Sequence, residues 1–168
     1  VSGTASAAIT LVKKVRPPKG ELIRMGLLAL ACSSLGATAV ALIDKDIMRP
    51  VIIVLMVAVG TFVAFRPSFG SGEGEGIRGG WRTWAGLAAV AAIAFYDGVF
   101  GPGTGMFLIM AFTAIFSQNF LTSAAMSKVV NTCTNVGALI AFILGGHVVW
   151  GLALVLAAAN ILGAQLGA

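Results

Sequence analysis

The chain has 168 residues, of which 58% are hydrophobic and 10% are charged, and its mean hydropathy is +0.99. About a quarter of the residues of a soluble domain are charged, so this composition excludes an ordinary soluble domain and indicates a membrane protein. The formal net charge of +5 does not predict nucleic-acid binding, because the basic residues lie in short connections between apolar segments and form no single basic surface.

Apolar segments in the first half predict transmembrane helices. Residues 1–12 are expected to be the end of a span that begins outside this sequence, and residues 25–43 and 50–65 are expected to be two further spans. About 20 apolar residues cross a bilayer, and residues 25–43 carry no charge. Five Lys and Arg residues lie within residues 13–24 but two within residues 44–50, so the first connection is expected to be cytoplasmic.

A hydrophilic, glycine-rich stretch divides the chain into two related parts. A helix that contains Ser2 leads to the span from Met25, and a helix that contains Ser127 leads to an apolar span from Val148 at similar spacing, which favours an internal repeat. We expect the end of a first repeat at residues 1–65, a cytoplasmic linker at residues 66–82 and a second repeat at residues 83–168.

The second half is predicted to contain a broken or re-entrant helix after Gly105. Residues 104–116 would form a helix of about 20 Å, which is shorter than a membrane span. If this half-helix turns back, the loop at His147 is cytoplasmic and the repeats are parallel; if it crosses, that loop is external and the repeats are inverted. The expected elements are a span at 83–97, the half-helix at 104–116 and spans at 121–146 and 148–168.

The stretch from Phe95 to Gly105 places an acid, a proline and four glycines inside an apolar region. Glycine and proline weaken a helix interior, so the stretch predicts an interruption. A helix that begins near Gly103 would point its free backbone N–H groups and positive dipole end at an anion. The alternative is close helix packing through Gly101 and Gly105. The proposed anion-binding residues here are Gly101, Gly103, Thr104 and Gly105.

Lys128 lies within a predicted span, where a charged amine is costly and usually faces a cavity, a partner or a substrate. Asn131 and Asn135 follow on the same helix face and supply donors without fixed negative charge, which suits an anion. The alternative for Lys128 is that its side chain extends to the membrane interface.

Asp97 has three interpretations: an ion pair with Lys128, a proton acceptor during transport, or a structural acceptor that holds the glycine-rich loop beside Tyr96. Cys32 and Cys133 are expected to be small buried apolar side chains. The single histidine, His147, gives no metal-binding spacing and no Ser/His/Asp arrangement. We therefore expect no enzyme, no catalytic residue, no metal and no cofactor.

Three motifs resemble the TauE/SafE family of membrane permeases, also called TSUP and formerly DUF81. They are Phe95-Tyr96-Asp97-Gly98-x-Phe100-Gly101-Pro102-Gly103-Thr104-Gly105, then Lys128-Val129-x-Asn131-x-x-x-Asn135, and finally Leu144-Gly145-Gly146-His147-Val148-x-Trp150. The resemblance implies a duplicated bundle of about eight helices that moves sulfur-containing anions such as sulfite or organosulfonates. It also implies that the glycine-rich turn, Lys128, Asn131 and Asn135 form the substrate region.

The expected protein is an all-α, polytopic secondary permease for a small anion of the sulfite or organosulfonate class in a bacterial cytoplasmic (inner) membrane. Its expected partners are the anionic substrate and membrane lipid, with a homo-oligomer as an option and no nucleic acid. Two alternatives stay open: an anion channel, which would conduct without coupling to an ion gradient, and a non-transporting membrane scaffold, in which the polar helix face would be packed and dry.

Overall fold

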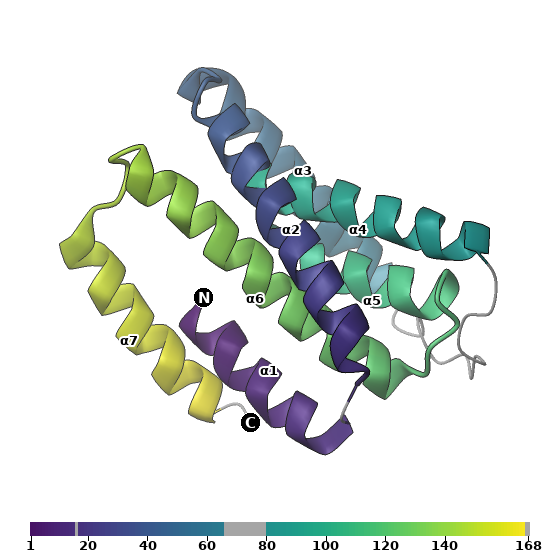
Figure 1. Ribbon diagram of the computed structural model, residues 1–168. Coiled ribbons are helices and arrows are strands. Elements are labelled where there is room, and N and C mark those ends of the chain that lie inside the picture. Colours follow the sequence, from purple (N-terminus) through teal and green to yellow (C-terminus); the bar gives the residue numbers. More distant parts are fainter. Residues whose placement is uncertain (16, 66–79, 167–168) are drawn as a thin grey trace.

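A computed structural model describes residues 1–15, 17–65 and 80–166, and these ranges are helical with short turns (Figure 1). The predicted all-α class is confirmed for this part of the chain. Its helices are α1 (Ser2–Val15), α2 (Lys19–Val40), α3 (Lys45–Phe65), α4 (Gly80–Val99), α5 (Thr104–Ala114), α6 (Phe120–Leu144) and α7 (Trp150–Leu166).

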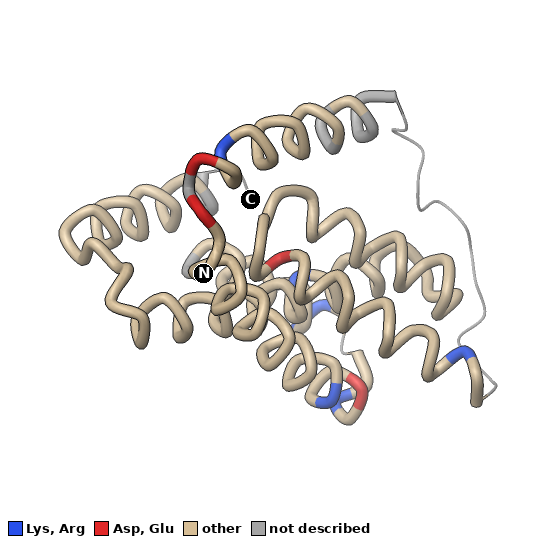
Figure 2. Tube along the Cα trace, turned by 90° about the horizontal axis from the view of Figure 1, so that it is seen from above, with Lys and Arg blue, Asp and Glu red and all other residues tan. Residues whose placement is uncertain are grey.

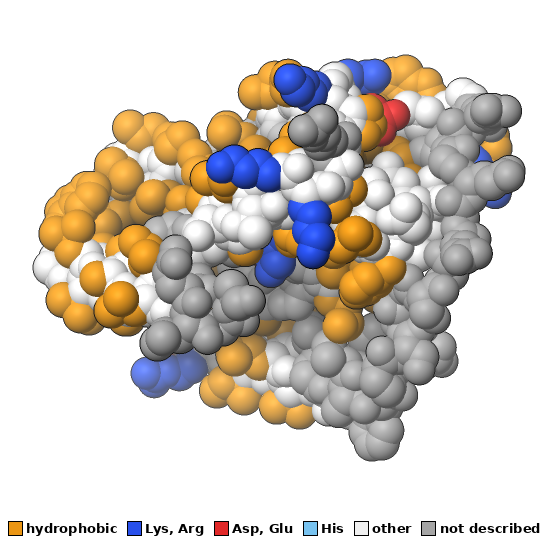
Figure 3. Space-filling view, turned by 90° about the horizontal axis from the view of Figure 1, so that it is seen from below, with side chains coloured by type: hydrophobic (Ala, Val, Ile, Leu, Met, Phe, Trp, Pro, Cys, Tyr) orange, Lys and Arg blue, Asp and Glu red, His pale blue; other side chains and the backbone are white. Residues whose placement is uncertain are grey.

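The surface of this bundle is apolar along the helices and charged near their ends. Both α2 and α6 have the length and hydropathy of membrane spans, while α5 and residues Trp150–Gly163 are shorter apolar helices. Long stretches of helix carry no charged residue (Figure 2), and Lys and Arg side chains gather on the end where α1 meets α2 (Figure 3). Large apolar side chains that face outward include Leu27, Leu35, Val54, Val57, Leu154 and Val155. A surface of this kind fits lipid rather than water.

Several helices begin earlier than the apolar runs alone predict. The second helix starts at Lys19, before the predicted Met25, because its first turns carry charged residues that favour helix and stay exposed. The third starts at Lys45 and contains Pro50. Most of the predicted linker, residues 66–79, lies outside the described residues, and residues 80–82 belong to the first turn of α4.

The core lies where α2 packs against α4 and α6, with α5 packed on the other side of α4 and α6. Glycines bring the backbones together: a Cβ on Gly98 would lie 2.1 Å from the Ser33 carbonyl oxygen, and one on Gly137 would lie 2.3 Å from that of Leu30. The Ser33 hydroxyl donates to the Thr134 carbonyl at 2.7 Å and joins α2 to α6. Buried apolar side chains fill the remaining space: Met25, Ala29, Val90, Ala94, Leu108, Phe112, Phe116, Met126 and Val130.

The contacts also fix the helix directions. The early part of α4 lies beside the early part of α2, near Glu21 and Thr83, and the end of α4 lies beside Ser33. The contact of Gly26 with Cys133 and of Leu30 with Gly137 shows that α6 is parallel to α2 as well (Figure 1). In contrast, α5 runs back along α4 and along the first half of α6.

The glycine-rich turn joins α4 and α5 into a hairpin whose tip lies beside the middle of α6. Gly101 and Gly103 have φ angles of 83° and 84°, which favour glycine, and Gly103 is the N-cap of α5. Since α5 returns to the end where α2 and α4 begin, α6 starts at that end too. The His147 turn therefore lies at the opposite end, next to Ile43 and Arg49 at the turn between α2 and α3. Here α5 does not stay at the far end of α4 but runs the whole way back, which is the direction that the crossing half-helix and inverted repeats require.

Candidate functional site

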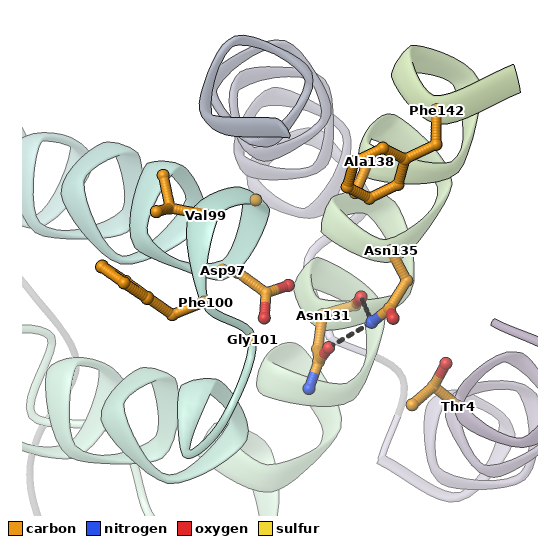
Figure 4. Close-up of a pocket in the computed structure, with 10 residues that line it drawn as sticks. Thr4, Asp97, Val99, Phe100, Gly101, Asn131, Asn135, Ala138 and Phe142 are labelled. Atoms are coloured by element: carbon orange, nitrogen blue, oxygen red, sulfur yellow. Dashed lines mark hydrogen bonds between the residues drawn. The ribbon is translucent and has the colours of Figure 1, made fainter. Parts of the chain in front are cut away.

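A cavity of about 520 Å³ lies where the tip of the α4–α5 hairpin meets α6 and the start of α1 (Figure 4). The cavity lies beside the second half of α6, from Asn131 to Phe142, and is partly open to the surface of the described chain. It is lined by Thr4 of α1, by Asp97, Gly98, Val99, Phe100 and Gly101 of the hairpin, and by Asn131, Asn135, Ala138 and Phe142 of α6.

Asp97 projects from the last turn of α4 toward α6 (Figure 4). One carboxyl oxygen, Oδ1, accepts a hydrogen bond from the Thr104 hydroxyl at 2.5 Å. The same hydroxyl lies 2.8 Å from the Gly101 carbonyl oxygen, so the two acceptors share one proton. Thr104 is buried and joins the start of α5 to the end of α4 across the turn. Within the described residues, Asp97 forms no salt bridge with a Lys or Arg side chain.

Asn131 and Asn135 face Asp97 from one side of α6 (Figure 4). The Nδ2 of Asn135 donates to the Asn131 carbonyl at 2.5 Å and to the Asn131 Oδ1 at 2.6 Å. No described residue hydrogen-bonds to the Oδ1 of Asn135 or to the Nδ2 of Asn131. That Nδ2 lies next to Gly105, since a Cβ on the glycine would lie 3.4 Å from it. The Asn131 amide thus presents its oxygen to Asn135 and its nitrogen to the start of α5.

Two further hydrogen bonds hold the turn in place. The Tyr96 hydroxyl donates to the Pro102 carbonyl at 2.9 Å, and the Tyr96 ring packs against Phe100 and Phe107. The Ser127 hydroxyl donates to the Gly105 carbonyl at 2.8 Å and ties α6 to α5. In this structure Tyr96 therefore supports the turn from behind instead of facing the cavity.

The structure brings some of the predicted site residues together and leaves others apart. Asp97, Gly101, Asn131 and Asn135 line one cavity, and Thr104 joins them through Asp97. The other four are not lining residues: Tyr96 packs behind the turn, Gly103 and Gly105 lie at the start of α5, and Lys128 is half-buried on α6 one turn before Asn131.

Thr4 was not predicted to belong to the site, although it lies two residues after Ser2 in the helix whose spacing favours an internal repeat. The nearby Gly3 N–H donates to the Asn160 Oδ1 at 3.0 Å and joins α1 to α7. The start of α1 lies beside residues 131–142 of α6 and its end beside residues 129–133, so the two helices are antiparallel. If α1 and α6 are equivalent helices of the two repeats, the polar residues of α1 would be expected at the same site as those of α6, and this reasoning would have identified Thr4. The other residues singled out from the sequence lie elsewhere: Cys32 and Cys133 are free and half-buried, and His147 is exposed.

We expect a cysteine at position 131 to react with a water-soluble, membrane-impermeant thiol reagent, because the cavity has room for water and the Asn131 amide nitrogen has no partner among the described residues. The background would be the full-length protein with Cys32 and Cys133 replaced by alanine. A cysteine at the fully buried Val130 is the matched control and is expected to stay unmodified. Equal protection of both positions would show that this helix face is dry, as a scaffold requires.

Comparisons with known proteins place this geometry in context. The family described as "Sulfite exporter TauE/SafE" matches residues 1–168. The chain is 30% identical over 166 residues to "Probable membrane transporter protein YfcA" of Escherichia coli (strain K12), with 98% of this chain and 61% of the relative covered. It is 31% identical over 168 residues to a "Probable membrane transporter protein" of Haemophilus influenzae, with 100% of this chain and 65% of the relative covered. No solved structure matches the chain significantly.

Proposed function

Because the chain belongs to the sulfite exporter TauE/SafE family, we propose that it is part of a secondary permease for a small sulfur-containing anion of the sulfite or organosulfonate class. The names of its relatives describe membrane transporters and not enzymes. The chain spans about three fifths of the length of these relatives, so the proposed transport is an activity of the whole protein.

One observation carries this proposal: a polar cavity lies at the tip of a broken helical hairpin, beside the middle of the long apolar helix α6. Secondary transporters commonly bind their substrates where discontinuous helices meet near the bilayer midplane. A dry scaffold has no need of a cavity that contains a carboxyl group and two amides. The geometry therefore favours transport over the scaffold alternative.

The anion would bind on the α5 side of Asn131. The Asn131 Nδ2 is directed to Gly105, and the first N–H groups of α5 have no partner within the helix. These groups and the positive end of the α5 dipole favour negative charge. Lys128 lies one turn away on α6 and would supply a full positive charge. Together they would replace the hydration that the anion loses on entry.

We place the protein in the bacterial cytoplasmic membrane as a multi-pass protein. The basic residues between α1 and α2 would face the cytoplasm, because short cytoplasmic connections carry an excess of Lys and Arg. The parallel arrangement of α2 and α6 would then put the His147 turn outside. The hairpin of α4 and α5 would enter from the cytoplasmic side and carry its tip to the middle of the membrane.

Anion flux in vesicles that contain the full-length protein tests the assignment of Lys128. We expect Lys128→Met to lower sulfite or organosulfonate flux about tenfold or more, because a hydrogen bond to a charged group contributes about 1.5–3 kcal/mol. Lys128→Ala is expected to behave in the same way, and Lys14→Met, which removes an exposed lysine at the end of α1, is the control. Wild-type flux of every tested anion in both Lys128 variants would show that this lysine is not required.

Electrical recording separates a permease from an anion channel. A channel carries the anion down its own gradient whether or not a second ion gradient is present. A secondary permease depends on a coupled ion, and the measured flux should then follow the gradient of that ion. No specific observation in the structure favours the channel.

A further inference from the structure

The cavity lies at the negative end of α4. Its wall includes Asp97, Gly98 and Val99, which form the last turn of that helix. The last helix-type hydrogen bond at this end runs from the Phe100 N–H to the Tyr96 carbonyl at 2.8 Å. The carbonyl groups of Asp97, Gly98 and Val99 have no hydrogen-bond partner among the described residues. Unpaired carbonyls at the end of a helix carry partial negative charge, which favours a cation.

The Asp97 carboxyl group adds a full negative charge at the same place. One of its oxygens is bound by the Thr104 hydroxyl, and the carboxyl group points across the cavity toward α6 (Figure 4). Among the side chains that the structure describes, no Lys or Arg lines the cavity. The nearest basic residue along α6, Lys128, lies one turn beyond Asn131 on the side of the α5 start. An anion placed directly against this wall would be repelled.

Side chains with oxygen atoms also line the cavity from the other two elements. The Asn135 amide is oriented by donating its Nδ2 protons to Asn131, which leaves the Asn135 Oδ1 free of partners in the described chain. Thr4 places a hydroxyl at the edge of the cavity from α1 (Figure 4). Carboxylate, carbonyl, amide and hydroxyl oxygens are the ligands that hard cations prefer.

We propose that this cavity is a sodium site, in which Na⁺ binds between the Asp97 carboxylate, the free carbonyls that end α4 and the Oδ1 of Asn135. A monovalent ion matches the single carboxylate, whereas a divalent ion would leave an unbalanced positive charge among apolar helices. If the bound cation were a proton, the Asp97 carboxylate alone would be enough to hold it. The further oxygen atoms of this wall are suited to a metal ion that needs several ligands. Half-helix carboxyl ends and unwound carbonyls coordinate Na⁺ in other transporters.

The role of this ion rests on the proposed anion transport. Asn131 divides the two regions, since its Oδ1 faces Asn135 and the cation site while its Nδ2 faces Gly105 and the α5 start. Bound Na⁺ would cancel the charge of Asp97 next to the anion path. The anion would then bind better in the presence of Na⁺, and Na⁺ would be the coupled ion.

Sodium binding can be measured without any anion substrate. We would titrate the purified full-length protein in detergent with NaCl, using KCl or choline chloride at constant ionic strength and pH as references. We expect a saturable rise of the thermal unfolding midpoint in NaCl that choline chloride does not produce. Asp97→Asn should weaken the apparent Na⁺ affinity about tenfold or more, because loss of even an outer-sphere group typically costs that much.

Two further variants keep the test decisive. Asn135→Leu removes the amide oxygen and should also weaken Na⁺ binding, which matters if Asp97→Asn does not fold. Asp46→Asn removes an exposed acid of α3 outside the cavity and should bind Na⁺ like the wild type. Equal stabilisation by all three salts, or stabilisation that follows pH and not Na⁺, would overturn the sodium site.

The outcomes also separate this proposal from the proposed function. Anion flux that persists with no Na⁺ binding and no dependence on a Na⁺ gradient rejects the sodium site and leaves the permease intact. Saturable Na⁺ binding in a protein that moves no sulfite or organosulfonate supports the site and rejects the anion assignment.

Discussion

Gly98→Ala is expected to lower the thermal unfolding midpoint of the full-length protein strongly, although alanine favours helix over glycine by about 1 kcal/mol. The new Cβ would lie 2.1 Å from the Ser33 carbonyl oxygen and 2.9 Å from the Ala37 nitrogen. Both are backbone atoms of α2 and cannot rotate away, so α4 has to move as a whole. Overpacking of this kind typically costs about 1–3 kcal/mol or more.

The control for this substitution is Gly151→Ala in α7, where the added Cβ meets no atom within 4 Å. That change should leave the midpoint unaltered or raise it slightly through helix propensity. Gly36→Ala tests the same contact from the other side, because its Cβ would lie 2.3 Å from the Phe95 carbonyl oxygen. If Gly98→Ala and Gly36→Ala both unfold at the wild-type temperature, α2 and α4 do not pack as closely as described.

Gly101→Ala is expected to abolish anion flux while leaving a folded protein. The φ angle of Gly101 is 83°, so an L-residue there costs about 1–2 kcal/mol, although a Cβ would meet only the Asp97 carbonyl at 3.8 Å. The turn can relieve this strain by rotating the Gly101 carbonyl away from the Thr104 hydroxyl. That rotation would leave Asp97 as the acceptor of the Thr104 hydroxyl proton, and both side chains would shift at the edge of the cavity.

A matched variant separates the effect of Gly101→Ala on the site from the effect of backbone strain on stability. Gly146, in the turn after α6, also has a positive φ of 69° and has open space around its Cβ position. Gly146→Ala should therefore cost a similar free energy of unfolding but keep wild-type anion flux. Equal losses of flux in the two variants would show that the effect is one of stability alone and has no special connection with the hairpin tip.

Most of the helical content follows from residues close together in the sequence. Apolar runs predict the helices, and local chemistry sets several of their ends. The Asn119 side chain accepts a hydrogen bond from the Thr122 N–H at 2.8 Å and begins α6. Two bonds end that helix, from the Gly146 and His147 N–H groups to the carbonyls of Ile143 and Phe142. Hydropathy alone missed the charged first turn of α2, since it detects the apolar part of a helix and not the whole helix.

The candidate site could be predicted only in part. The four-residue spacing of Asn131 and Asn135 places them on one helix face, and the glycines mark a turn. Asp97 reaches this helix face because Gly98 packs against Ser33, a residue far away in the sequence. A local sequence pattern cannot predict such a contact. Lys128 lies on the same helix face as Asn131 and Asn135. A helical side chain leans toward the N-terminus of its helix, so the Lys128 side chain leans away from Asn131 and the cavity.

The glycine contacts described above also limit which helices can move relative to one another. Where α2 meets α4 and α6, backbone lies on backbone at Gly36, Gly98 and Gly137, with no flexible side chains between them to absorb sliding. These three helices must therefore travel as one rigid body. Among the described elements that line the cavity, α1 packs on α6 without a glycine contact of this kind, and the Gly3 N–H hydrogen-bonds it to Asn160 of α7. Under the proposed transport function, a movement of α1 and α7 against α2, α4 and α6 would open or close the cavity without breaking the glycine contacts.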